Sequence, residues 1–186
     1  MRNVVRTAAC VLVAALAVPA VWATTAVERT EGDLIQEAVV IVTGRCVGLK
    51  PTWIDRDLVT LATIEVTETL KGNPVSQVTV VLPGGIDTNR PVPVAMTFPA
   101  APEIFMAENV LLFLTAEDRV QNGYAVAGFS QGKFTVVEDA QGKSVATQNL
   151  SSLNLQNRKG GITRGATKAI SIEALRQKIK ESNNAQ

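Results

Sequence analysis

Few residues in this chain have a type and spacing that could support chemistry. The 186-residue sequence contains no histidine. Imidazole is the base of Ser-His-Asp and Cys-His catalytic sites near neutral pH, and it is a ligand in most zinc sites. We therefore expect a protein that is not an enzyme and that needs neither a cofactor nor a metal ion.

Cys46 is the one candidate nucleophile. The other cysteine, Cys10, lies in an amino-terminal segment that we expect to be removed, so no internal disulfide can form. A lone cysteine in an apolar strand is usually a small buried side chain. The alternatives are a reactive thiol or an intermolecular disulfide, and a reactive thiol needs exposure and a nearby cation. Arg45 is adjacent, but successive residues of a strand point to opposite faces.

Carboxylate chemistry needs two acids that converge in one pocket with separated pKa values. The candidate acids fall on the exposed face of an expected strand or near turns, and they are Glu65, Glu68, Asp118, Glu138 and Asp139. We predict that none of them is catalytic. The glycine-containing stretch 82–85 is followed by neither a helix start nor a lysine, so it predicts a tight turn rather than a phosphate cradle.

Trp53 is the candidate partner contact. It lies beside Pro51, which we expect to end the first strand and place the tryptophan in a loop. An exposed aromatic side chain in a loop can anchor a partner protein. The alternative is that the ring covers one end of the folded domain.

The first 23 residues have the three-part pattern of a cleavable signal peptide. A cationic start, Met1–Arg6, precedes an apolar stretch, Ala8–Ala23, that ends in small residues. The stretch is shorter than the roughly 20 apolar residues of a membrane span and contains Pro19. We predict cleavage after Ala23, no stable membrane span afterwards, and a secreted or periplasmic protein. Acylation at Cys10 is less favoured, because an acylated cysteine should close the apolar stretch.

Charge argues against nucleic acid as a partner. Without Arg2 and Arg6, 16 basic residues remain against 17 acidic ones, a net charge of −1. Proteins that bind phosphates usually carry a basic face or stripe, whereas the cations of this chain are spread singly. We expect the partner to be an exported or envelope protein.

The remaining 163 residues fit a single domain of mainly β structure. Alternating apolar residues and turn signals predict strands at 39–47, 57–70, 75–82, 92–97, 109–115, 124–129, 132–138 and 143–147. The stretch 109–115 is apolar on both faces and should be the most buried strand. Segment 86–108 is rich in proline, and we expect Phe98, Ile104 and Phe105 to pack it onto the domain.

Helices are expected at the two ends of this domain. Residues 33–38 predict a short helical turn, and residues 170–183 predict a carboxy-terminal helix with Ser171 as N-cap. The polar, glycine-containing stretch 148–169 predicts a mobile loop or linker. The fold class is thus a small OB-like β-barrel over residues 24–147 with a short amino-terminal helical turn and a carboxy-terminal helix.

Three pieces of this pattern resemble a known family. They are the opening strand 39–47 with its glycine, the strand 64–72 that ends in Leu-Lys-Gly, and the late apolar strand 109–114. The arrangement is similar to the netrin modules, the OB-type barrels that include the tissue inhibitors of metalloproteinases. The resemblance implies a barrel that binds another macromolecule through loops at one end. Those inhibitors act through an amino-terminal cysteine, which this chain lacks, so their mechanism does not carry over.

These observations favour a non-enzymatic exported binding module that contacts a secreted or envelope protein. Two alternatives remain open at this point. One is a thiol-dependent activity or an intermolecular disulfide at Cys46, and the other is a structural component of the cell envelope.

Overall fold

A computed structural model describes residues 24–73, 75–138 and 140–184. The expected signal peptide, residues 1–23, lies outside the described residues. The elements in chain order are β1 (Thr24–Val27), α2 (Glu31–Glu37), β2 (Val40–Ile54), β3 (Asp57–Lys71), β4 (Gln77–Pro83), β5 (Gly85–Asp87), β6 (Val94–Met96), β7 (Asn109–Glu117), β8 (Gly123–Val126), η1 (Phe129–Gly132), β9 (Lys133–Glu138), β10 (Ser144–Asn149), β11 (Leu153–Gln156), β12 (Ile162–Arg164), β13 (Thr167–Ser171) and α3 (Ile172–Asn184). None of the described helices is long and apolar enough to cross a membrane.

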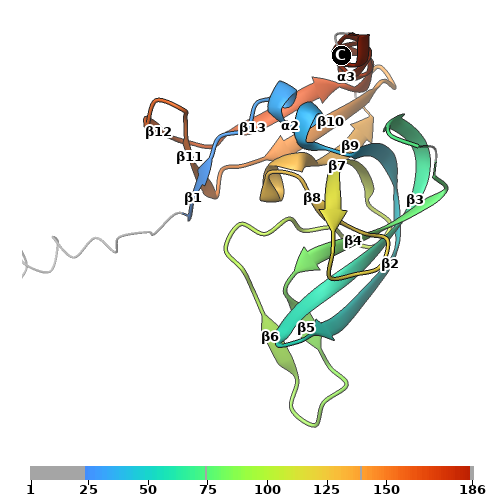
Figure 1. The fold of residues 1–186 in the computed structure, drawn as a ribbon, viewed down its shortest axis with the longest axis vertical. Helices are drawn as coiled ribbons and strands as arrows, with labels where there is room; N and C mark the ends of the chain where they lie inside the picture. Colours follow the sequence, from blue (N-terminus) through green and yellow to red (C-terminus); the bar gives the residue numbers. More distant parts are fainter. Residues whose placement is uncertain (1–23, 74, 139, 185–186) are drawn as a thin grey trace, which may run out of the picture.

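The predicted mainly β, OB-like barrel is confirmed. Strands β7, β2, β3, β4 and β8 follow one another in a sheet, and a further pairing between β8 and β7 closes them into a ring (Figure 1). Neighbouring strands are antiparallel except β4 and β8, which are parallel. Closure satisfies the strand edges that an open sheet would leave unpaired.

Strand β7 is shared between two cores, which explains why it is apolar on both faces. Val110, Leu112 and Leu114 point into the barrel, with Cys46 and Ile64 among their neighbours. Leu111 and Phe113 face the opposite way, into a second cluster beneath the helices. All five residues from Val110 to Leu114 have no exposed surface, so the prediction that this strand is deeply buried is confirmed.

The second core lies between an extension of the sheet and the two helices. Strands β9, β10 and β13 continue the sheet beyond β7, and α2 and α3 lie over it at the upper end in Figure 1. Ile172, Leu175 and Ile179 of α3 are buried there. Ser171 caps this helix as predicted, because its hydroxyl accepts a hydrogen bond from the Ala174 amide at 3.4 Å. Residues 170 and 171 belong to β13, so the helix starts two residues later than expected.

The prediction of a mobile linker at 148–169 is wrong. This stretch contains β11, β12 and the start of β13, and β11 pairs in parallel with β1 near the amino-terminal end. A small buried cluster accompanies these strands and consists of Leu150, Leu153 and Leu155. The sequence did not predict these strands, because the stretch is polar and the pairing partner of β11 lies more than a hundred residues away, which leaves no local signal.

The first strand was also predicted too short. β2 runs through Pro51 to Ile54 and forms a long hairpin with β3, in which Trp53 pairs with Leu58. Pairing between β2 and β7 covers only Val40–Arg45. Beyond Arg45, β2 therefore has one edge that β7 does not cover, where a proline without an N–H is tolerated.

Candidate functional site

Segment 84–108 leaves the barrel after β4 and returns at β7. Gly84 has a positive φ of 87°, and a Cβ on it would lie 2.5 Å from the Met96 carbonyl oxygen. The Gly84 amide donates a hydrogen bond to the Leu58 carbonyl at 3.0 Å, and the Gly84 carbonyl accepts one from Thr60 Oγ1 at 2.9 Å. The chain passes from β4 into β5 through this single residue without a turn, so the predicted tight turn is wrong, and β5 continues along the β2–β3 hairpin.

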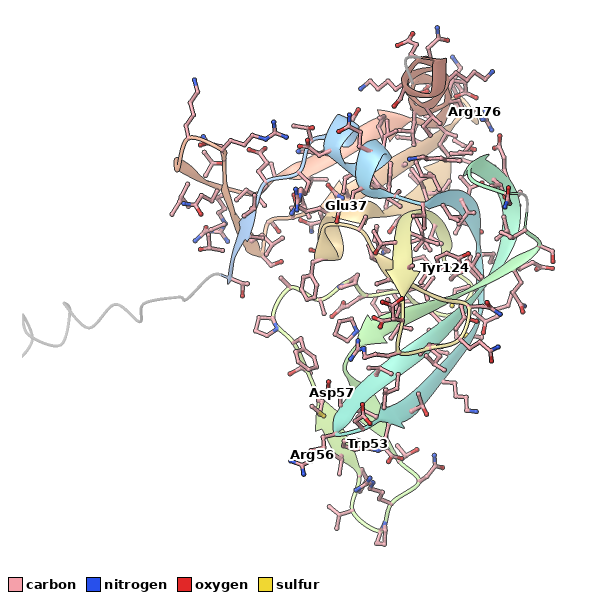
Figure 2. The ribbon with its side chains drawn as sticks, viewed as in Figure 1. Glu37, Trp53, Arg56, Asp57, Tyr124 and Arg176 are labelled. Carbon is pink, nitrogen blue, oxygen red and sulfur yellow. The ribbon has the colours of Figure 1, made fainter. Side chains whose placement is uncertain are left out.

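Trp53 lies in β2, not in the loop that the sequence predicted. Its Nε1 donates a hydrogen bond to Asp87 Oδ2 at 2.8 Å, and the Arg90 guanidinium lies 4.5 Å from the ring centroid. Figure 2 shows Trp53 at the far end of the hairpin, in the same region as Arg56 and Asp57. The ring is half-buried and connects the β2–β3 hairpin to the β5–β6 hairpin.

The Asp87 carboxylate holds this junction together. The hydrogen bonds from Trp53 and from the Asn89 amide, together with the charge of Arg90, keep the pKa of Asp87 below its ordinary 3.8. Arg90 Nε reaches the same carboxylate at 3.1 Å. The outer end of segment 84–108 is therefore fixed to the barrel by one indole, one carboxylate and one guanidinium.

Exposed apolar side chains gather on this segment. Of the eleven large apolar side chains that are exposed in the described part of the chain, five lie between residues 86 and 106. We call these five the apolar wall: Ile86 (59% exposed), Val92 (73%), Phe98 (40%), Phe105 (62%) and Met106 (57%). An apolar patch that folding leaves in water is a common mark of an interaction surface.

Ile104 anchors the inner end of the segment. It is 5% exposed and belongs to the core cluster of the barrel, as predicted. Phe98 and Phe105 were also expected to pack inward, but both remain exposed. Between this segment and the barrel lies an apolar groove of about 400 Å³, lined in part by Leu49, Leu82, Ile86, Met96, Phe98 and Phe105.

A half-buried polar network lies where the segment rejoins β7. Lys133 Nζ donates to Glu108 Oε1 at 2.6 Å and to Thr135 Oγ1 at 3.0 Å, and Thr135 donates to the same carboxylate at 2.6 Å. Burial pushes the pKa of Glu108 upward. The hydrogen bonds from Lys133, Thr135 and the Phe105 amide outweigh burial, so the pKa lies below its ordinary 4.5.

Lys133 and Thr135 of this network line a second cavity, which shares Phe98, Glu103 and Phe105 with the groove. The cavity has a volume of about 520 Å³ and lies between residues 98–105 and strands β9 and β10. We call it the polar cavity. Its lining combines the rings of Phe98 and Phe105 with polar side chains, namely Glu103, Ser130, Lys133, Thr135, Thr147, Gln148, Asn149 and Ser152.

Cys46 lies inside the barrel and is 1% exposed. Burial raises the pKa of its thiol above the ordinary 9.0, and the negative charge of Glu108 raises it further. Sγ donates a long hydrogen bond, 3.6 Å, to the Gly48 carbonyl. Burial and the charge of Glu108 both oppose formation of a reactive thiolate.

Of the acids considered from the sequence, Glu65, Glu68, Asp118 and Glu138 lie among the described residues. Glu68 forms a bidentate pair with Arg176 of α3, with N–O distances of 2.6 and 3.0 Å, so it links the helix to the barrel. Asp139 lies outside the described residues. In residues 24–184, apart from the undescribed positions, no group of three or more metal-ligating side chains is gathered.

The sequence did not predict Glu108, Lys133 or the polar side chains around them. Lys133 is 25 residues from Glu108, and neither belongs to a recognisable motif. Only the fold brings them together. Comparison with known proteins adds no relatives, because no family model, curated protein or solved structure matches this chain.

Proposed function

We propose that this chain is a non-enzymatic exported binding module, which holds a secreted or envelope protein against its apolar wall. The single observation that supports this most strongly is the concentration of exposed apolar side chains over residues 86–106. Desolvation of such side chains in the centre of an interface provides most of its binding free energy. The partner surface should therefore be apolar at its centre and polar at its rim.

Charge supports recognition by apolar contact rather than by long-range attraction. The net charge of the full chain is +1 and that of the expected exported form is −1. Strong electrostatic steering needs a marked charge of one sign on the binding face. At the outer end of the wall, Arg90 and Asp87 already neutralise each other.

The wall is held rigidly enough to bind without much reordering. Its outer end is fixed by the Trp53–Asp87 hydrogen bond, and its inner end by Ile104 and the Glu108–Lys133 pair. A surface that is already ordered loses less conformational entropy on association. Segment 84–108 is thus suited to present apolar side chains in a fixed arrangement.

A thiol-dependent function at Cys46 is the less favoured proposal. The thiol is buried in the barrel and its pKa is raised, so neither nucleophilic attack nor a disulfide to a partner is accessible without opening the core. A purely structural envelope role in which α3 docks elsewhere is also less favoured, because the apolar face of α3 is already buried against the sheet.

Site-directed photo-cross-linking tests the proposal. A photoreactive amino acid is placed at Ile86, Phe105 or Met106, and the variants are expressed from the full-length gene in the native host. The proposal predicts that all three positions capture the same protein. The same residue is placed at Val137 and Ile162, which are exposed on β9 and β12 outside the wall, and these should capture nothing in common with the wall.

Two outcomes contradict the proposal. One is capture of the same set of proteins from Val137 and Ile162 as from the wall, which would indicate random collision. The other is the absence of any common product from the three wall positions.

A further inference from the structure

The polar cavity contains atoms whose hydrogen-bonding capacity the protein leaves unused. The amide side chain of Gln148 is 5% exposed, and its nitrogen donates to the carbonyls of Gln131 and Lys133. Its Oε1 accepts no hydrogen bond from the described residues. No buried side-chain oxygen or nitrogen of the described residues lacks a hydrogen-bond partner, so this oxygen is accessible from the cavity. It is therefore available to accept a hydrogen bond from a ligand.

Other polar groups of the lining also have unused hydrogen-bonding capacity. Within the described part of the chain, the hydroxyls of Ser130 and Ser152 and the Nδ2 of Asn149 have no partner. Lys133 has three ammonium protons, two of which go to Glu108 and Thr135. The cavity thus offers both donors and acceptors, and most of them are neutral.

The charges around the cavity exclude anionic ligands. The only cation in the lining is Lys133, and Glu108 already neutralises it at 2.6 Å. Glu103 also lines the cavity, and no described cation pairs with it. A phosphate or a carboxylate would meet this unpaired negative charge without a compensating cation, so the ligand should be neutral.

Two aromatic rings also line the cavity. Phe98 and Phe105 line it, and both rings keep a large exposed area. A ligand that fits must therefore present an apolar face on one side and a set of hydroxyl or amide groups on the other. Sugar rings have this character, because the C–H groups on one face pack on aromatic rings while the hydroxyls both donate and accept. The volume of about 520 Å³ is within the usual range of small-ligand sites.

We propose that the polar cavity binds a neutral oligosaccharide, with one sugar face on Phe98 and Phe105 and the sugar hydroxyls on Gln148, Asn149 and the two serines. This site goes beyond the proposed protein contact and does not depend on it. Ile86 and Met106 of the apolar wall do not line the polar cavity. Variants at those two positions should weaken partner capture and leave sugar binding unchanged.

The test is a two-dimensional ¹H–¹⁵N NMR titration of the labelled protein, expressed from its full-length gene. The probes are tri-N-acetylchitotriose, maltotriose and cellotriose at millimolar concentration, with tetraglycine as a peptide of similar length. At least one trisaccharide should cause saturable shifts of amides in residues 147–152 and at Phe105. Overturning results are no saturable shift with any of the three sugars, or a stronger shift of the same amides with tetraglycine.

Variants locate the binding on the cavity. For the trisaccharide that binds, Phe105→Ala should weaken affinity about tenfold, and Ser152→Ala about threefold. Ser76→Ala, an exposed serine far along the chain in the turn before β4, is the matched control and should leave affinity unchanged. The spectra also report that each variant is folded. Equal affinity in Phe105→Ala and wild type would overturn the proposal.

Discussion

Strand β7 and the apolar wall both contain large apolar side chains, but those of β7 are buried and those of the wall are exposed. Every residue from Val110 to Leu114 has no exposed surface, whereas Ile86, Phe105 and Met106 are each more than half exposed. β7 is enclosed on two faces, by the barrel and by the helices. The wall is enclosed on one side only, where Ile104 enters the barrel.

The difference shows that apolar composition alone does not distinguish a core strand from a binding surface. In both regions, moving an apolar side chain out of water lowers the free energy. The side chains of β7 leave water when the protein folds, so they stabilise the fold. The wall has not, so its side chains remain available for association.

The largest expected difference between the two regions is in chemical accessibility. The thiol of Cys46 in the folded protein should react with a maleimide only through opening of the core, at a rate lowered ~10³-fold or more relative to the unfolded chain. In Cys46→Ala/Met106→Cys, the new wall thiol should react at the rate of a free thiol. Rates followed by mass spectrometry provide the comparison. Fast labelling of folded wild type, or a disulfide-linked dimer, would make Cys46 a functional thiol.

Truncating a side chain of β7 should lower the free energy of unfolding far more than truncating a side chain of the apolar wall. Leu112→Ala removes a side chain with no exposed surface from the barrel core. We expect a loss of about 2–5 kcal/mol in the free energy of unfolding, because the surrounding core cannot fill the cavity. Urea denaturation measures it. A loss below about 1 kcal/mol would mean that the barrel interior is loosely packed.

Glu108 lies where the two regions meet, and its substitution should have an intermediate effect. Glu108→Gln leaves the Lys133 ammonium, which is 16% exposed, without its charged partner. We expect a loss of about 2 kcal/mol at neutral pH, less than the roughly 3–5 kcal/mol of a fully buried pair. Ser130→Ala, in the same cavity lining, keeps the ion pair and removes no hydrogen bond between described residues, so it serves as control. Equal stabilities of Glu108→Gln and wild type would show that the pair contributes nothing.

Acid should remove the same contribution. The folded pKa of Glu108 lies below the ordinary 4.5, so the ion pair stabilises the protein fully above that pH and loses its effect as the pH falls through the folded pKa. The difference in unfolding free energy between wild type and Glu108→Gln should therefore shrink below about pH 4.5. A difference that stays constant down to pH 3 would contradict the assigned network.

The smallest structural effect is expected at the outer end of the wall. Trp53→Phe keeps an aromatic ring beneath Arg90 but removes the hydrogen bond to Asp87. Loss of this hydrogen bond should lower the free energy of unfolding by less than Glu108→Gln does. It should also increase amide hydrogen exchange in residues 85–96 while leaving β7 unchanged. Increased exchange in β7 would show that the wall and the core open together.

The sequence was sufficient to predict the helices and strands whose residue patterns are local. The alternation in 57–70, the apolar run 109–114 and the Ser171 cap each predicted the observed element, and the OB-like barrel follows from them. Prediction was wrong where a distant partner decides the structure. β11 pairs with β1, and β2 continues through Pro51 because β3 supports it.

The candidate site was less accessible to sequence reasoning than the fold. Trp53 was identified as a residue of interest, but its contact with Asp87 depends on the β5–β6 hairpin lying beside the β2–β3 hairpin. Phe98 and Phe105 have the same residue type as the buried Phe113. Only the path of the chain from Ile104 to Glu108 decides that these rings face outward.

The central claim is that the apolar wall is not needed for folding, and the unfolding free energy of Ile86→Ser/Met106→Ser tests it most directly. Because both side chains are more than half exposed, we expect urea denaturation to give the wild-type value within about 0.5 kcal/mol. The same variant should lose its cross-linked product from Phe105. A loss of stability comparable to that of Leu112→Ala would contradict the claim, since it would place the wall within the core.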